Sequence, residues 1–134
     1  MLHPDWSYRS VLYEINVRQL THEGTLRAAA ARLAFLRDLG IDAVWLMPVC
    51  PIGEDGRKGS LGSYYSIRDY CAVNSELGTL EDFDAFVTEA HRLGMKVLLD
   101  WVANHTARDA RWIMEHPDFY VYDYQGRPAV PWDW

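Results

Sequence analysis

The sequence predicts an α/β fold in which short parallel strands alternate with helices. Three continuous apolar segments, 11–17, 41–48 and 95–102, are separated by two segments with helical spacing of apolar residues. The junction DLGIDAVWL at 38–46 can be laid over RLGMKVLLD at 92–100, so the helix-to-strand unit repeats. Alternating units of this kind indicate a parallel sheet covered by helices and joined by right-handed crossovers. On this pattern alone, part of a barrel and a flavodoxin-like sheet both fit.

The first unit begins with VLYEINV at 11–17, whose apolar and β-branched residues predict a strand. Thr25 then predicts the start of a helix, and Gly40 predicts its end. Apolar residues recur every three or four positions in this helix and predict one buried face: Leu26, Ala29, Leu33, Leu36 and Leu39. The segment IDAVWLMP at 41–48 predicts the second strand.

The second helix has a clearer start, because Thr79 followed by Asp82 resembles a capping box with Asp in place of the usual Glu. Its predicted buried face consists of Leu80, Phe83, Phe86, Val87, Ala90 and Leu93. Gly94 predicts the end of the helix, and MKVLLDWV at 95–102 predicts the third strand.

A loop of about thirty residues, 49–78, separates the second strand from the second helix, and a loop this long is usually a binding loop or a disordered one. The loops that leave the carboxyl ends of parallel strands build the active site in α/β folds. The loop and the stretch DWVANHT at 100–106 should therefore border one cleft. Beyond Thr106 we expect a short helix at 107–116, stopped by Pro117, and then an irregular aromatic tail.

The DWVANHT stretch places an acid, an amide and an imidazole together where the third strand ends. Asp100 could serve a site, or it could cap the next turn or pair with an arginine. His105 could donate to a substrate hydroxyl, or it could be a hydrogen-bonded structural residue. The proximity of the three polar residues favours a functional role.

Two further groups of residues have both functional and structural interpretations. Asn104 offers an amide oxygen of the kind that calcium accepts, but the residues alone favour a turn-forming role, and the spacing to downstream carboxylates matches no EF-hand loop. The carboxylates that could join it are Asp109, Asp118 and Asp123. The loop tyrosines could pack within the loop or present a ring face to a sugar: Tyr64, Tyr65 and Tyr70.

The composition is that of an ordinary globular domain, with 49% hydrophobic and 24% charged residues. The net charge of -6 and the scattered basic residues make nucleic acid an improbable partner. There is no apolar run that would cross a bilayer and no secretory leader, so we expect no membrane partner and a cytoplasmic location. Cys50 and Cys71 are expected to be buried free thiols, with a disulfide between them as the alternative.

Taken in order, several segments resemble the α-amylase family of glycoside hydrolases, also called glycoside hydrolase family 13. They are YEINVRQL, WLMPV, YSIRDY, VNSELGTLEDF and AHRLGMKVLLDWVANHT, and they span nearly the whole chain. The resemblance implies the amino-terminal portion of a TIM (β/α)8 barrel, with strands 1–3 and helices 1–2 in residues 1–106. Residues 107–134 would then begin the small domain that this family inserts after its third strand.

The resemblance also implies roles for individual residues. Tyr65 would stack on the sugar whose bond is cleaved, His105 would bind that sugar's hydroxyls, and Asp100 would orient an arginine near the nucleophile. Asn104 matches a residue that often binds calcium, an ion that some members lack. Asp69 would fix the loop. Members of the α-glucosidase type have Asp after the loop tyrosine, whereas this chain has Ser66, which weakens assignment to that subgroup.

By resemblance, the chain is a segment of a retaining enzyme that cleaves α-1,4-glucosidic bonds of starch, glycogen or maltooligosaccharides, with glycosyl transfer as a close alternative. The family takes its nucleophile, its acid/base and a third acid from strands four, five and seven, so we expect these 134 residues to be inactive alone. The rival from another class is a non-catalytic α/β module that binds sugar; a nucleotide-binding module is weaker. An uncovered third strand should also need the rest of the barrel or self-association.

Overall fold

The computed structural model describes residues 3–130 and contains a three-stranded sheet, five α-helices and two 3-10 helices within that range. The strands are β1 (Leu12–Ile15), β2 (Ala43–Leu46) and β3 (Lys96–Leu99). The α-helices are α1 (Val17–Leu20), α2 (Leu26–Ala30), α3 (Leu33–Asp38), α4 (Leu80–Arg92) and α5 (Trp112–Glu115). The 3-10 helices are Asp5–Tyr8 and Pro117–Phe119.

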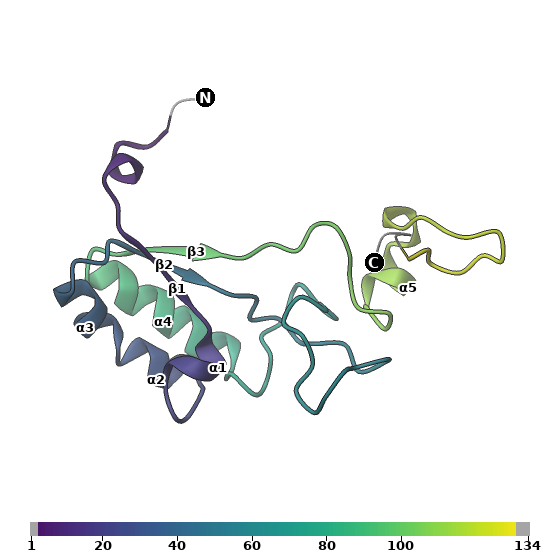
Figure 1. Ribbon diagram of the computed structural model, residues 1–134, viewed down its shortest axis with the longest axis horizontal. Coiled ribbons are helices and arrows are strands. Elements are labelled where there is room, and N and C mark those ends of the chain that lie inside the picture. The colour runs from purple at the N-terminus through teal and green to yellow at the C-terminus, as the bar shows by residue number, and fades with distance from the viewer. Residues whose placement is uncertain (1–2, 131–134) are drawn as a thin grey trace.

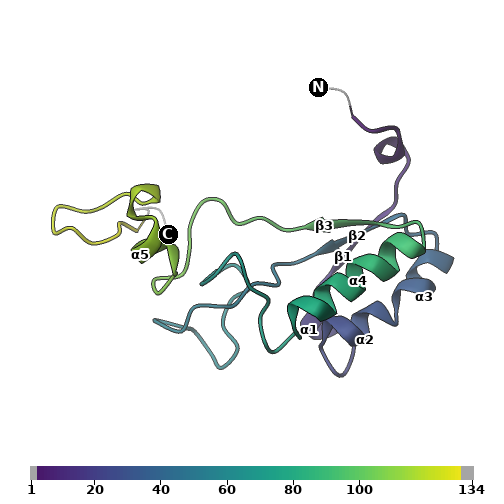
Figure 2. The same cartoon turned by 180° about the vertical axis from the view of Figure 1, so that it is seen from behind.

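The three strands are parallel and lie in sequence order, β1-β2-β3. The register places Tyr13 opposite Val44 and Val44 opposite Val97. Figures 1 and 2 show α2, α3 and α4 together on one side of this sheet. A flavodoxin-like sheet carries helices on both faces, whereas a barrel wall carries them only on its outer face. The one-sided cover decides between the two predicted architectures in favour of part of a barrel.

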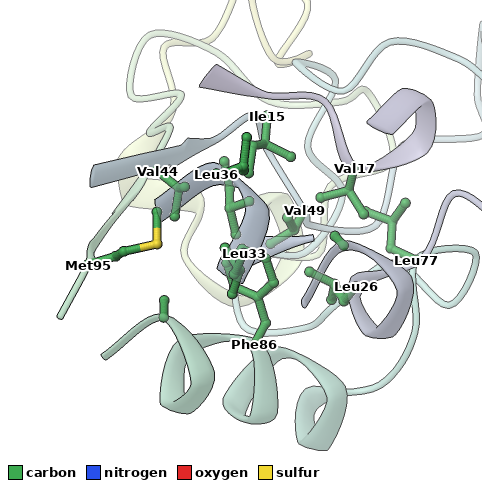
Figure 3. Close-up of a cluster of buried hydrophobic side chains, with 13 residues drawn as sticks. Ile15, Val17, Leu26, Leu33, Leu36, Val44, Val49, Leu77, Phe86 and Met95 are labelled. Carbon is green, nitrogen blue, oxygen red and sulfur yellow. The ribbon is translucent and has the colours of Figure 1, made fainter. Parts of the chain in front are cut away.

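The hydrophobic core fills the space between the sheet and these helices, as Figure 3 shows. Its largest fully buried side chains include Phe86 from α4, Leu33 from α3 and Ile15 from β1. The opposite face of the sheet, which would be the inside of a barrel, remains open, and Leu12, Glu14 and Leu98 are exposed there.

The predicted first helix is two short helices, because the chain turns more tightly between them. Arg32 N–H donates to Ala29 O at 3.0 Å, a bond that spans three residues and ends the regular α-helical ladder. Thr25 does cap α2, since its side chain accepts from Ala28 N–H. Leu39 was wrongly assigned to the buried face: it follows α3 and is 62% exposed.

The second helix follows the prediction more closely. Thr79 Oγ1 accepts from Asp82 N–H at 3.3 Å, and Asp82 Oδ2 accepts from Thr79 N–H at 3.1 Å, so the capping box is confirmed. Phe86 and Ala90 are fully buried. Leu80 was wrongly assigned to the buried face, because the first turn of α4 lies at the rim of the core and this side chain is 56% exposed.

The strands are shorter than the apolar segments that predict them. β1 stops at Ile15, and Asn16 then begins the helical turn α1. β3 stops at Leu99, although Asp100 N–H still donates to Leu46 O at 2.9 Å. β3 pairs only with β2 among the strands of residues 3–130, which leaves Leu99 53% exposed.

The loop and the tail are mostly irregular. The predicted helix at 107–116 is confined to Trp112–Glu115, and Pro117 opens a 3-10 turn. Cys50 and Cys71 are free, as favoured, but Cys50 is only half-buried and Cys71 is exposed. None of the helices within residues 3–130 is long and apolar enough to cross a membrane.

Candidate functional site

A side-chain hydrogen bond joins the loop between β2 and α4 to the residue that directly follows β3. Tyr65, from the loop, donates its Oη–H to Asp100 Oδ2 at 2.9 Å. Asp100 directly follows β3 and lies at the carboxyl edge of the sheet, where parallel α/β folds build their sites. The structure thus brings together two of the residues that the sequence singled out.

The same hydrogen bond fixes the chemical state of Tyr65. The bond to Asp100 raises the pKa of the Tyr65 phenol, and partial burial and the charges of Asp100 and Glu14 add to the rise. The phenol is therefore a neutral donor at neutral pH. Tyr65 as a whole residue remains 38% exposed, which leaves it accessible to a flat apolar ligand such as a sugar ring.

His105 lies five positions beyond Asp100 in the same stretch and is half-buried. Tyr70, at the far end of the loop motif, donates its Oη–H to the backbone carbonyls of Val102 and His105, the latter at 3.2 Å. The Tyr70 ring stacks on Trp112 with centroids 4.5 Å apart and an interplanar angle of 18°. Tyr70 therefore ties the backbone segment that carries His105 to the loop.

Asn104, the predicted calcium ligand, has an exposed side chain. Two of the carboxylates that could have joined it are occupied within the chain: Asp109 accepts from Glu54 N–H, and Asp123 accepts from the backbone of Gln125 and Arg127. Nowhere between residues 3 and 130 do three acidic, histidine or cysteine side chains gather in a way that could hold a metal ion. Calcium binding by Asn104 stays a prediction, because calcium also accepts amide and backbone carbonyl oxygens.

Sequence reasoning named Asp69 and Asp109 but missed the two arginines that pair with them and join the loop to the segment after β3. Arg111 pairs with Asp69 at 3.3 Å, and Arg68 lies 3.6 Å from Asp109. Burial raises the pKa of Asp109, but hydrogen bonds from backbone N–H groups, first that of Glu54, and the charge of Arg68 outweigh it and leave that pKa lowered. The signal was available as two complementary charged runs, RD at 68–69 and RDAR at 108–111.

A hollow of about 440 Å³ opens among these charged residues rather than beside Tyr65 and Asp100. Its lining consists of Pro51, Arg68, Asp69, Asp109 and Arg111. The charged groups of this lining already pair with one another and so connect the loop to the segment after β3. We therefore do not expect catalysis in this hollow. Asp69, which also accepts from Cys71 N–H at 2.8 Å, has the contacts of a residue that fixes the loop.

Comparison with known proteins identifies the family. The family model described as alpha amylase, catalytic domain, matches residues 8–134. An oligo-1,6-glucosidase of Bacillus cereus is 34% identical over 130 residues, which are 87% of this chain and 22% of the relative. A trehalose-6-phosphate hydrolase of Bacillus subtilis is 32% identical over 96% of this chain and 24% of the relative. The chain thus spans about a quarter of the curated relatives it matches.

Solved structures give the same answer for the fold. An α-amylase from Lactobacillus plantarum superposes with a TM-score of 0.89 at 44% identity, over 93% of this chain and 30% of that one. A maltogenic α-amylase from Thermotoga neapolitana superposes with a TM-score of 0.87 at 40% identity, over 91% of this chain and 30% of that one. The amino-terminal part of a TIM barrel, expected from the motifs, is confirmed. This chain belongs to the α-amylase family of glycoside hydrolases.

Proposed function

We propose that this chain supplies the β1–β3 wall of the sugar site in a retaining α-glucan-active hydrolase that cleaves α-1,4-glucosidic bonds. The observation that carries the proposal is the Tyr65–Asp100 hydrogen bond at the carboxyl edge of the sheet. It fixes an exposed aromatic ring beside a carboxylate on the rim where barrels place their sites. Starch, glycogen and maltooligosaccharides are the proposed substrates, in keeping with the two α-amylases at 44% and 40% identity.

Each of the three residues has a distinct proposed role. Tyr65 stacks its exposed ring face on the sugar whose bond is cleaved. His105 donates a ring N–H to hydroxyls of that sugar. Asp100 holds Tyr65 with one carboxylate oxygen and orients an arginine with the other.

The bond-breaking carboxylates are proposed to come from strands beyond β3. A retaining glycosidase needs two carboxyl groups roughly 5 Å apart, one as nucleophile and one as acid/base. Asp100 instead accepts from the Tyr65 phenol, so it fits a supporting role better than that of nucleophile. Transfer of the glycosyl unit to a second sugar shares the same covalent intermediate and stays an alternative outcome. Calcium, if used, would need ligands besides Asn104.

The exposed edge of β3 supports a further part of the proposal. Leu98, Leu99 and Trp101 are exposed along this edge and just beyond it. An unpaired edge with apolar side chains favours pairing with another strand. We propose that the remaining barrel strands, or a second copy, cover it.

The test compares turnover of maltoheptaose by the 134-residue chain with turnover by the longer protein that the gene encodes, if its reading frame continues past Trp134. This protein is called the longer product. We expect activity only in the longer product, and loss of that activity when His105 is changed to Ala. Isomaltotriose serves as the α-1,6-linked comparison substrate and should be cleaved more slowly. Hydrolysis by the short chain would contradict the absence of the catalytic carboxylates, and faster cleavage of isomaltotriose would contradict the proposed linkage.

The second candidate, a sugar-binding module without catalysis, is favoured by the exposed aromatics beyond β3. Trp101 is 75% exposed and Tyr124 is 94% exposed. If neither product hydrolyses maltoheptaose, yet the sugar changes tryptophan fluorescence, this candidate replaces the hydrolase.

A further inference from the structure

The side chain of Tyr70 reaches across from the loop to the segment that carries His105. Its Oη–H donates to the backbone oxygens of Val102 and His105, so one hydroxyl spans both ends of the Val102–His105 tetrapeptide. The two residues between these anchored positions in the sequence, Ala103 and Asn104, are both exposed. The position of this phenol oxygen therefore bears on the geometry of the whole tetrapeptide.

The phenol oxygen is itself held in place from two directions. The Tyr70 ring stacks on Trp112, at the start of α5, with centroids 4.5 Å apart. Backbone bonds fix the two segments on either side: Ala107 N–H donates to Ile67 O at 2.8 Å, and Arg111 N–H donates to Arg68 O at 2.9 Å. The donor is thus part of a rigid junction rather than a free surface side chain.

Burial also raises the pKa of the Tyr70 hydroxyl, with smaller contributions from Tyr120 and Cys50. The hydroxyl accordingly keeps its proton throughout the neutral range and can act as a donor. A partly buried backbone carbonyl that loses its hydrogen-bond donor is left unsatisfied, which costs free energy. The segment can recover this free energy by moving until the carbonyl reaches water or another donor. Removal of the hydroxyl should therefore move the Val102–His105 segment.

We propose that Tyr70 is a positioning residue that sets the placement of His105 for sugar binding through the carbonyls of Val102 and His105. This inference rests on the proposed function, because it assigns Tyr70 a task within the same sugar site. Tyr70 itself does not touch the sugar: its ring is stacked on Trp112 and its hydroxyl is directed at the backbone. Its influence on binding should pass through His105.

The test uses the Tyr70→Phe variant of the full 134-residue chain, which keeps the stacked ring and removes only the hydroxyl. Tyr64→Phe is the matched control, because it removes a phenol in the same loop whose hydrogen bond, 2.8 Å to Asn16 Oδ1, leads to β1 instead. Loss of one hydrogen bond in a partly buried place predicts a roughly threefold to tenfold weaker Kd for maltoheptaose in Tyr70→Phe. Tyr64→Phe should change this Kd less than twofold.

A merely structural role for Tyr70 is separated by a double-mutant cycle with His105→Ala. If Tyr70 acts through His105, then Tyr70→Phe should have no further effect on maltoheptaose affinity once His105 is Ala. Effects of the two changes that multiply independently would overturn the proposal. NMR of the His105 ring gives a second readout: its Cε1–Hε1 resonance should shift in Tyr70→Phe and stay in place in Tyr64→Phe, and an unmoved resonance in both would also overturn it.

Failure of the proposed function gives a different pattern. If His105→Ala and Tyr65→Ala both leave maltoheptaose binding unchanged, the sugar site is wrongly placed. The NMR comparison still decides whether Tyr70 positions His105, because that readout needs no sugar.

Discussion

The hydrogen bond between Tyr65 and Asp100 should be measurable as a coupling energy in unfolding. A hydrogen bond to a charged acceptor contributes roughly 1.5–3 kcal/mol when buried, and exposure reduces this toward the value for surface pairs. The Oη to Oδ2 distance is 2.9 Å and residue Tyr65 is 38% exposed, so we expect a coupling of about 1 kcal/mol, or roughly fivefold in the unfolding equilibrium.

The assay is a double-mutant cycle of Tyr65→Phe, Asp100→Ala and the pair, with urea unfolding followed by tryptophan fluorescence and circular dichroism. Tyr13→Phe is the matched control: Tyr13 is 39% exposed, and its hydroxyl takes part in none of the hydrogen bonds found within residues 3–130. It should change the free energy of unfolding by less than about 0.5 kcal/mol. Single-mutant effects that add to the double-mutant effect within about 0.3 kcal/mol would refute the reasoning.

Two further predictions concern the helix that forms the core. Phe86→Ala should lower the free energy of unfolding by about 3–5 kcal/mol, because Phe86 is fully buried. Leu80→Ala, on the exposed first turn, should lower it far less. Equal losses of unfolding free energy, measured with urea, would contradict the assigned core. Hydrogen bonds from Thr79 N–H, and then from Arg27, lower the pKa of Asp82 below its ordinary value of 3.8. The ionised carboxylate therefore stabilises the fold at pH values above 3.8, and this stabilisation is lost as the pH falls through the lowered pKa. Asp82→Asn should therefore weaken the dependence of the thermal midpoint on pH between about pH 5 and pH 2. A pH dependence equal to that of the unaltered chain would contradict this assignment.

The repeating pattern of strands and helices was predictable because it depends on local periodicity. The Thr79 and Asp82 pair predicted the start of α4 correctly, since both bonds of a capping box form within four consecutive residues. Leu39 and Leu80 were misplaced because apolar spacing gives a helix face but not how far the core extends along it. The division of the first helix into α2 and α3 depends on one tight turn that the apolar pattern does not encode.

The site was predictable to a smaller extent. Asp100 and His105 could be found because they follow an apolar strand within one short run. Their connection to Tyr65 and Tyr70 joins residues more than thirty positions apart, and it depends on how the loop folds back. The ion pair between Asp69 and Arg111 was missed for the same reason, although its complementary runs are visible once the two segments are known to meet.

The most direct test of the central claim is calorimetric titration of maltoheptaose into the 134-residue chain and its Tyr65→Ala and His105→Ala variants, with Arg37→Ala as a remote surface control. If β1–β3 form the wall of a sugar site, the chain and the control bind alike, and each site variant binds markedly more weakly. Equal binding by all four proteins, or none by the unaltered chain under conditions where it is folded, would contradict the claim.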